Sequence, residues 1–346
     1  MTKKKQNTTD ETIIGLDIGY GATKVIMGNE SIIFPSVAGH AREIKFRADE
    51  LAIKYPGEQI TDEDGDWFVG DLAMSQLRPG DLLRLRGRTA DEQSLGNAFR
   101  LRMMKAALGK LFPGLRNGEA LHLVISTGLP VDHMRDAAEF KTALIGIHRI
   151  QTDQTDFVAH VTDAIVMPQP YGTIYRDMLT DRGEINECYT YTKTGVIDIG
   201  TYTVDITLDD DGEYIDSRSG SVEAGVYTVQ EVIANAYERD YRAKPHHRDI
   251  EHIIKTGCFR IKGEPVDYSQ ERNEAIKPLK DAVLNLINER WQAAVDIDVI
   301  NVSGGGAAMV ADAIKRAYPQ ARLVADAQLA NAIGYRNYAL FMAQEV

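Results

Sequence analysis

The residues of this chain whose types and spacing could do chemistry stand near its start, in the stretch IIGLDIGYGATKV over residues 13–25. In order, that stretch carries Asp17, Gly19, Tyr20, Gly21 and Lys24. A turn with glycine at positive φ aims backbone N–H groups at a polyphosphate, and a lysine on the returning strand adds a point charge. A single carboxylate can hold Mg2+ through water. The stretch therefore predicts a site for a magnesium-bound nucleotide.

A second stretch of the same type lies in the other half of the chain. GLDIGYGATKVIM and VIDIGTYTVDITL share an apolar–apolar–Asp-Ile-Gly core, and Asp17 and Asp198 are the matching positions. Gly200 and Thr201 belong to the second turn. One such unit in each half predicts two related domains with a nucleotide cleft between them, where Asp198 acts from the wall opposite Asp17. The alternative is a chance similarity between two Asp-x-Gly hairpins.

The elements that must position these residues alternate between strands and helices, which predicts an α/β fold. Apolar residues at helical spacing predict helices at 94–112, 226–241 and 275–295. A buried strand is expected at 120–130, and a strand, a glycine loop and a helix are expected over 298–318. Residues 243–273 are polar, with a local helix near 248–257. The glycines form neither GxxxxGK[ST] nor GxGxxG after a strand, so the fold is not expected to be that of those two nucleotide-binding families.

Composition excludes several classes of protein. The 346 residues carry a formal net charge of -12, which argues against a general binder of nucleic acid or membrane surfaces, since both need a basic face. The two cysteines, Cys188 and Cys258, form no CxxC pair and no zinc spacing, as expected of reduced thiols in the cytoplasm. Residues 1–12 are polar and charged and are expected to form a disordered tail, and no stretch approaches the length of a membrane span.

Five motifs in order give the chain a resemblance to the actin–hexokinase–heat-shock ATPase superfamily. They are GLDIGYGATKV and VIDIGTYTVDI for the phosphates, AIVMPQPYGT and AQLANAIGY for the connections, and NVSGGGA for the adenosine. The start of the chain, the ISTGLPV stretch and the PQPYG connector are most similar to plasmid-partition actins of the ParM/StbA type and their archaeal and phage relatives.

The resemblance implies roles for individual residues. Asp17 and Asp198 resemble the two magnesium-associated aspartates, Lys24 the lysine that contacts phosphate, and Gln169 the residue that orients the attacking water. The resemblance also implies nucleotide contacts from the two turns and from the glycine loop Gly304, Gly305 and Gly306. Ala332 and Gly334 resemble a hinge, and the adenine pocket has Gly225, Gln230 and Glu231 as candidates. The alternatives are a surface lysine at 24, a plain loop amide at 169 and a flexible turn at 303–306.

The implied organisation is a tail at 1–12, an actin-like domain I at 13–190, a domain II at 191–325, and a C-terminal helix at 326–346 that packs back on domain I. The implied function is a cytoplasmic ATPase that uses ATP (or GTP) and Mg2+, polymerises head to tail with itself and depolymerises after hydrolysis. A role in plasmid or DNA segregation implies a DNA-binding adaptor as partner, with no direct contact to nucleic acid or membrane. The alternatives are a non-polymerising ATPase and a small-molecule kinase of the same fold.

Overall fold

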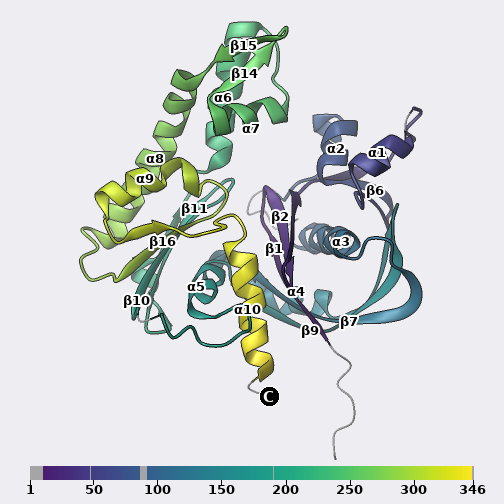
Figure 1. The fold of residues 1–346 in the computed structure, drawn as a ribbon, viewed down its shortest axis with the longest axis horizontal. Helices are drawn as coiled ribbons and strands as arrows, with labels where there is room; N and C mark the ends of the chain where they lie inside the picture. Colours follow the sequence, from purple (N-terminus) through teal and green to yellow (C-terminus); the bar gives the residue numbers. More distant parts are fainter. Residues whose placement is uncertain (1–10, 47, 86–91, 190, 345–346) are drawn as a thin grey trace, which may run out of the picture. The chain divides into compact units, whose positions relative to one another are not determined.

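The computed structural model describes residues 11–46, 48–85, 92–189 and 191–344 (Figure 1). They divide into two compact units. Unit 1 contains the described residues through Tyr189 together with those from Asn331 onward, and unit 2 contains those from residue 191 to Ala330. Of the tail expected at 1–12, residues 1–10 lie outside the described residues. No helix in the described ranges is long and apolar enough to cross a membrane.

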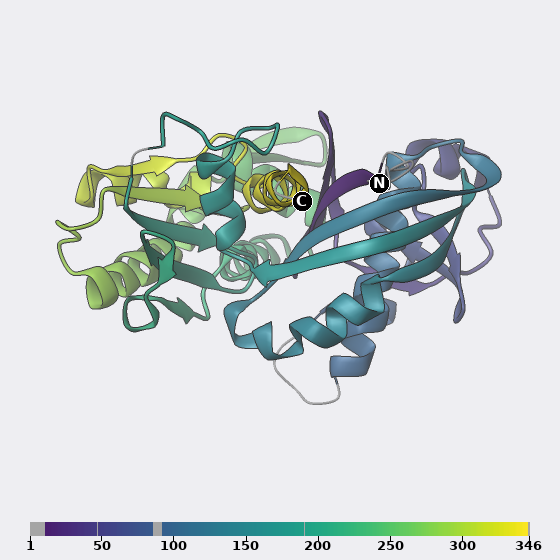
Figure 2. The ribbon, with the colours of Figure 1, turned by 90° about the horizontal axis from the view of Figure 1, so that it is seen from below.

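Unit 1 is built on a nine-stranded sheet in the order β3-β2-β1-β7-β9-β8-β5-β6-β4. Its strands are β1 (Thr12–Ile18), β2 (Ala22–Met27), β3 (Glu30–Pro35), β4 (Ala38–His40), β5 (Gln59–Asp62), β6 (Gly65–Val69), β7 (Arg116–Leu129), β8 (Gly146–Thr152) and β9 (Asp156–Pro168). Its helices are α1 (Ala48–Lys54), α2 (Gly70–Gln76), α3 (Glu92–Leu111), α4 (Ala137–Leu144), α5 (Tyr171–Met178) and α10 (Ala330–Gln344), with 3-10 turns at Pro79–Asp81 and Val131–Asp136. Figure 2 shows the long strands β7 and β9 side by side.

The core of unit 1 forms where α3 and α4 pack on the sheet. β1 and β7 pair in parallel, and their inward residues Leu16 and Leu123 are fully buried against Met103 of α3. The sequence of a parallel strand that is buried on both faces is a nearly continuous run of apolar residues. Residues 120–130 form such a run, and the sequence therefore predicts a strand there. The sheet thereby fixes the carboxyl end of β1, where Asp17 stands.

Unit 2 repeats the strand arrangement of unit 1. Its main sheet has the order β12-β11-β10-β16-β17, with β13 paired to β11. The strands are β10 (Lys193–Ile199), β11 (Val204–Asp210), β12 (Glu213–Tyr214), β13 (Gly220–Val222), β16 (Val299–Ser303) and β17 (Ala321–Leu323), with a separate hairpin of β14 (Cys258–Ile261) and β15 (Glu264–Asp267). The helices are α6 (Val226–Tyr241), α7 (His247–Thr256), α8 (Ser269–Trp291) and α9 (Ala307–Ala317), with a 3-10 turn at Asp216–Arg218.

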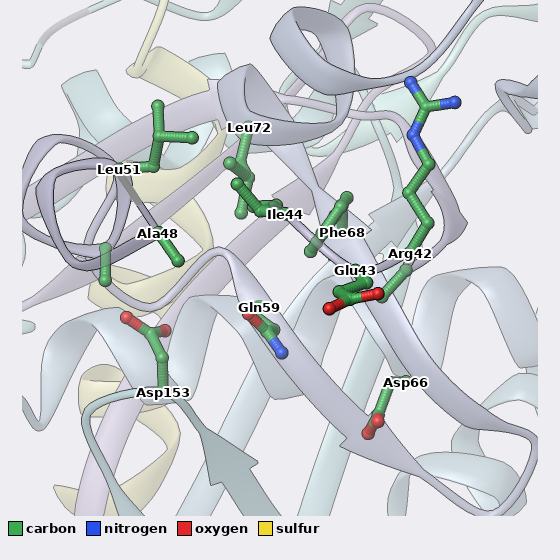
Figure 3. A pocket seen from close by; sticks show the side chains of 12 residues that line it. Arg42, Glu43, Ile44, Ala48, Leu51, Gln59, Asp66, Phe68, Leu72 and Asp153 are labelled. Atoms are coloured by element: carbon green, nitrogen blue, oxygen red, sulfur yellow. The ribbon is translucent and has the colours of Figure 1, made fainter. Parts of the chain in front are cut away.

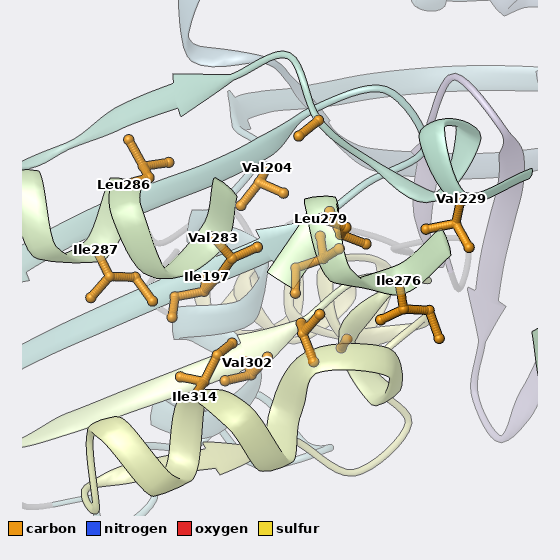
Figure 4. Close-up of a cluster of buried hydrophobic side chains, with 14 of the residues drawn as sticks. Ile197, Val204, Val229, Ile276, Leu279, Val283, Leu286, Ile287, Val302 and Ile314 are labelled. Carbon is orange, nitrogen blue, oxygen red and sulfur yellow. The ribbon is translucent and has the colours of Figure 1, made fainter. Parts of the chain in front are cut away.

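The two units share one connectivity around their first hairpins. β1 pairs antiparallel with β2 and parallel with β7, just as β10 pairs antiparallel with β11 and parallel with β16. The repeat inferred from the two Asp-Ile-Gly stretches is therefore present in the topology, and an α/β fold with two related domains is confirmed. In unit 2 the core lies where Leu279 and Val283 of α8 meet Ile197 of β10 (Figure 4).

The structure differs from the expectation in the polar region before α8. The hairpin β14–β15 lies there, and α8 begins at Ser269 and continues through Pro278. Residues 269–274 carry no apolar side chain, so apolar spacing could not mark this first part of the helix. Pro278 is on the exposed side of α8, which lets the helix accommodate the ring while its other side stays buried.

Candidate functional site

Asp17 lies near the end of β1 and is the most enclosed of the predicted site residues in unit 1, at 1% exposure. Its Oδ2 accepts a hydrogen bond from Lys24 Nζ at 2.8 Å, and its Oδ1 accepts one from Gln169 Nε2 at 2.9 Å. Lys24 reaches it from β2 because the two residues are direct partners in the antiparallel register. A buried carboxylate needs such partners, since an unpaired charge away from water is costly. The structure thus brings Gln169, which is 152 positions away from Asp17, to the pair formed by Asp17 and Lys24.

The main chain of Gln169 forms hydrogen bonds through both its N–H group and its carbonyl oxygen. Its N–H donates to the carbonyl oxygen of Leu129 at 2.8 Å, and its own carbonyl oxygen accepts the Tyr335 hydroxyl at 3.0 Å. An ionised carboxylate only accepts hydrogen bonds, so the amide nitrogen of Gln169 must be the end that faces Asp17. The amide oxygen is then the end left to accept a hydrogen bond from a ligand or water.

The first turn is tight, but Gly19 does not adopt the backbone conformation expected of it. Gly19 donates its N–H to the carbonyl oxygen of Ala22 at 3.1 Å, and Gly21 accepts from the N–H of Ser36 at 3.0 Å, with Tyr20 between them. The expectation of positive φ is wrong for Gly19. A Cβ at Gly19 would lie 3.1 Å from the Ala22 oxygen and 3.2 Å from Lys24 Nζ. The reason for glycine there is close approach, since a side chain would press on the lysine.

Asp198 occupies the corresponding place in unit 2, with a different neighbour. Its partner in the β10–β11 register is Asp205, where unit 1 has Lys24. Asp205 accepts a hydrogen bond from Thr203 Oγ1 at 2.8 Å. Like charges directly opposite on a sheet are destabilising, so this pair of carboxylates favours a cation nearby.

The glycine loop after β16 lies directly against Asp198. Gly304 has a φ of +89°, and a Cβ there would overlap the Asp198 carboxylate and come within 2.7 Å of the Ile199 nitrogen. The N–H groups of Gly304 and Gly306 are already used within unit 2, on the carbonyl oxygens of Ala327 and Ile199. A Cβ at Gly305 would meet only Gln328 Nε2 at 4.0 Å. Of the three glycines, Gly305 therefore presents the open backbone at the start of α9.

The second turn is joined to the start of α6. The carbonyl oxygens of Gly200 and Thr201 accept the N–H groups of Val226 and Tyr227, at 3.1 and 2.8 Å. A Cβ on Gly225 would overlap the Thr201 carbonyl, so only glycine allows this approach. Farther along α6, Gln230 is half-buried and Glu231 is exposed. Unit 2 thus gathers the second turn, Gly225 and the glycine loop around Asp198.

In the described part of the chain, the carboxylates near the two turns stand singly or in pairs. Within the described ranges, no group of three or more His, Cys, Asp or Glu residues is arranged to hold a metal ion. Mg2+ keeps several of its waters and takes few protein ligands, so one or two carboxylates suffice to hold it. Asp17 and Asp198 are the carboxylates that the two turns present.

The structure gives a packing role to Ala332 and Gly334, which the sequence indicated as a hinge, and adds Gly15, Gly172 and Tyr335, which the sequence did not indicate. A Cβ at Gly15 would overlap the carbonyl oxygen of Ala332, and one at Gly334 would overlap that of Gly172. The interior glycine of α10 therefore has a packing reason, because the helix backbone touches both β1 and α5. Tyr335 is fully buried beside them. The small residues in AQLANAIGY are the signal that could have indicated such close packing.

A separate pocket of about 370 Å3 lies in unit 1 (Figure 3). It is lined by Ala41, Arg42, Glu43, Ile44, Ala48, Leu51, Ala52, Gln59, Asp66, Phe68, Leu72 and Asp153. The guanidinium of Arg42 donates to the carbonyl oxygen of Gln76. None of the predicted site residues is among the residues that line this pocket, so it is not the site around Asp17.

Comparison with protein families assigns most of the chain. Residues 15–172 match the family described as the N-terminal domain of actin-like proteins, and residues 196–316 match the archaeal actin homologue family, MreB-like, C-terminal. A curated protein of Thermoplasma volcanium, an archaeal actin homolog, is 27% identical over 349 residues, which span 94% of this chain and 98% of its own.

Solved structures share the fold over nearly the whole chain. An archaeal actin homolog has a TM-score of 0.77 at 20% identity, covering 96% of this chain and 99% of its own. Its complex with ADP gives 0.74 at 20%, covering 94% and 98%. A 15-stranded ParM filament from Clostridium botulinum gives 0.73 at 22%, covering 98% and 100%. At these identities the likeness establishes a common fold.

Proposed function

Because this chain belongs to the actin-like superfamily, we propose that it is a magnesium-dependent ATPase whose nucleotide state controls its assembly into filaments. The observation that carries the proposal is the contact of Asp17 with both Lys24 and Gln169. An archaeal actin homolog of the same fold has been solved with ADP, and a ParM of the same fold as a filament, which supports both halves of the proposal.

The chemistry follows from what each side chain can offer. Phosphoryl transfer to water needs positioning and electrostatic stabilisation more than covalent help from the protein. Lys24 would place its charge on the phosphates, and the amide oxygen of Gln169 would accept a hydrogen bond from the attacking water. Asp17 would keep that amide oriented, because it binds the nitrogen end. Mg2+, when bound, would supply positive charge to the phosphate oxygens, with Asp17 and Asp198 as its water-mediated ligands.

The second turn and the glycine loop would act on the same nucleotide. Gly305, with its open backbone at the start of α9, would let the ligand approach main-chain atoms. Gly200, Thr201 and Gly225 would form the remaining wall in unit 2. We propose that binding of this nucleotide, and loss of its γ-phosphate on hydrolysis, change the association of the chain with its own copies.

Calorimetry with ATP or GTP and Mg2+ tests the binding half. Asp17→Ala and Asp198→Ala are each expected to bind at least about tenfold more weakly, since a hydrogen bond to a charged group contributes roughly 1.5–3 kcal/mol. Asp163→Ala is the control, because Asp163 is an exposed residue of β9 that pairs with Lys141. Wild-type affinity in both site variants would overturn the assignment.

Steady-state kinetics test the role of Gln169. Gln169→Ala is expected to lower the rate of ATP hydrolysis about tenfold or more while nucleotide affinity changes little, since it would orient water and not phosphate. Lost ATP binding in this variant would contradict the role. Release of ADP that depends on an added acceptor would instead identify a small-molecule kinase.

The filaments would serve DNA segregation through a DNA-binding adaptor, as the resemblance to plasmid-partition actins implies. Sedimentation with ATP and Mg2+ tests assembly, and co-sedimentation with candidate adaptors tests the partner. Protein that hydrolyses ATP yet stays in the supernatant at every concentration would support a non-polymerising ATPase.

A further inference from the structure

Tyr335 of α10 fills a slot that only glycines leave open. Its side chain is fully buried, at 0% exposure. A Cβ at Gly128 would overlap the Tyr335 hydroxyl, and one at Gly172 would lie 2.7 Å from its ring. The ring is therefore held between the end of β7, where the Leu129 carbonyl oxygen accepts the Gln169 N–H, and the start of α5, which follows Gln169 in the chain.

The hydroxyl of Tyr335 is aimed at the main chain of Gln169. It donates to the Gln169 carbonyl oxygen at 3.0 Å, and the N–H of Gly172 donates to the same oxygen at a longer 3.2 Å. A buried phenol needs a hydrogen-bond partner. Because the partner here is the carbonyl oxygen of Gln169, the hydrogen bond holds the main chain of the residue whose side chain reaches Asp17. Three hydrogen bonds thus connect α10 to Lys24 by way of Gln169 and Asp17, and the bond from Gln169 N–H to Leu129 holds the middle of this path.

We propose that Tyr335 is a positioning residue that holds the Gln169 amide in the orientation needed for hydrolysis. The inference rests on the proposed function of Gln169 and goes beyond it, because Tyr335 acts on the main chain of Gln169 and not on its amide. When the main chain of a residue is fixed, the end group of its side chain has fewer positions available. Such control matters because a displacement of about 1 Å at a reacting group can lower the rate roughly 100-fold.

Tyr335→Phe is the sharp test, because the ring stays in its slot and only the hydroxyl is lost. The expected result is a fall in kcat of about 3- to 30-fold with the affinity for ATP–Mg2+ unchanged. In the Gln169→Ala background, Tyr335→Phe should lower the rate little further, since the two act through one group. The matched control is Tyr338→Phe on the same helix, where the ring stacks on Tyr175 at 4.4 Å between centroids.

A second measurement does not depend on hydrolysis. The side-chain NH2 resonances of Gln169 in 15N-labelled protein, assigned by their loss in Gln169→Ala, should shift in Tyr335→Phe and stay in place in Tyr338→Phe. If wild-type protein hydrolyses no nucleotide but the resonances shift, the positioning contact stands and the proposed function fails. If hydrolysis is normal and neither kcat nor the resonances change in Tyr335→Phe, the positioning role is overturned.

Discussion

At the scale of single residues, Asp17 and Lys24 form a pair with little access to water. The side chains are 2% and 14% exposed, and the closest approach is 2.8 Å. Breaking such a pair from one side leaves a buried charge behind, whereas removing both charges leaves no such penalty.

We expect Lys24→Met to lower the free energy of unfolding by about 2–5 kcal/mol, because Asp17 would keep its charge without its cation. Lys24→Met combined with Asp17→Asn should recover most of that loss. Urea unfolding of the single and double variants measures both effects. A double variant less stable than Lys24→Met would contradict the account.

Gly334 gives a second prediction at the residue scale. Alanine favours a helix interior by about 1 kcal/mol over glycine, yet a Cβ at Gly334 would overlap the carbonyl oxygen of Gly172. Gly334→Ala should therefore destabilise the protein by about 1–3 kcal/mol despite the better propensity. Gly80→Ala, where a Cβ meets nothing within 4 Å, is the control and should change stability by less than about 0.5 kcal/mol. The denaturant midpoints of the two variants and of the wild-type protein measure these changes in stability.

Single residues also mark the limit of sequence reasoning. Asp17, Lys24 and Gln169 could be picked out because their residue types and motifs imply phosphate chemistry. Tyr335 could not, because its importance comes from a contact with a residue 166 positions away. The φ of Gly19 was mispredicted because a glycine can serve close approach as well as left-handed backbone.

At the scale of elements, local patterns were enough for the hairpins and the long helices. β1–β2 and β10–β11 were predictable because alternation and a turn are adjacent in sequence. β14–β15 was missed because each strand has only four residues, and β15 consists of Glu, Pro, Val and Asp, three of which are depleted in strands. Lys262 and Gly263 both have positive φ there, the sign of a type I′ turn, but Lys-Gly is not a strong signal for it.

The prediction for the helices concerns Pro278, which lies inside α8. It is exposed, so replacement by alanine restores a backbone N–H without disturbing the buried side of α8. Pro278→Ala should raise the free energy of unfolding by about 1–3 kcal/mol. Lys277→Ala, at the exposed neighbour that pairs with Asp281, should cost about 0.3–0.5 kcal/mol. A destabilised Pro278→Ala would mean that the bend at this position is needed for packing.

Asp296 joins the 3-10 turn Asp216–Arg218 to the start of β10. Arg218 donates to both of its carboxylate oxygens, and Lys193 Nζ lies 3.4 Å from Oδ2. The hydrogen bond from Arg218 is the main cause that lowers the pKa of the Asp296 carboxyl to about 2. A lowered pKa stabilises the fold above the unfolded value near ~3.9, and the gain is lost as pH falls toward 2.

We therefore expect the stability difference between wild type and Asp296→Asn to be constant from neutral pH to about pH 5 and to shrink from about pH 4 downward. Urea unfolding at a series of pH values measures it. Glu30→Gln, at an exposed position of β3, controls for the loss of one negative charge. A difference that grows on acidification would contradict the assignment.

At the scale of the whole molecule, the topology repeats but the chemistry of the two halves does not. Unit 1 sets lysine opposite its aspartate, and unit 2 sets a second aspartate there. The sequence could indicate the repeat because both motifs are contiguous. Which residues contact one another across several hundred positions depends on tertiary packing, and that is outside the reach of local patterns.

Assembly gives the prediction at this scale. If nucleotide controls association through a heterologous contact, the chain should form an open polymer above a threshold concentration. Light scattering should rise on addition of ATP and Mg2+ above that threshold, and decay as ATP is consumed. In Gln169→Ala the signal should persist longer, since the bound γ-phosphate survives longer. Flat scattering during steady hydrolysis would count against filaments.

The helix that carries Tyr335 and Arg336 also sets an order of events during synthesis. Tyr335 follows its partner Gln169 by 166 residues, and Arg336 follows its partner Gly28 by 308. For most of translation, a nascent chain would therefore contain Asp17 and Lys24 but lack α10, whose Tyr335 holds the main chain of Gln169. If the chain hydrolyses nucleotide as proposed, turnover would reach its full rate only after α10 has left the ribosome. Copies still attached to one messenger RNA, held close together, would thus run the nucleotide cycle slowly until each has made that helix.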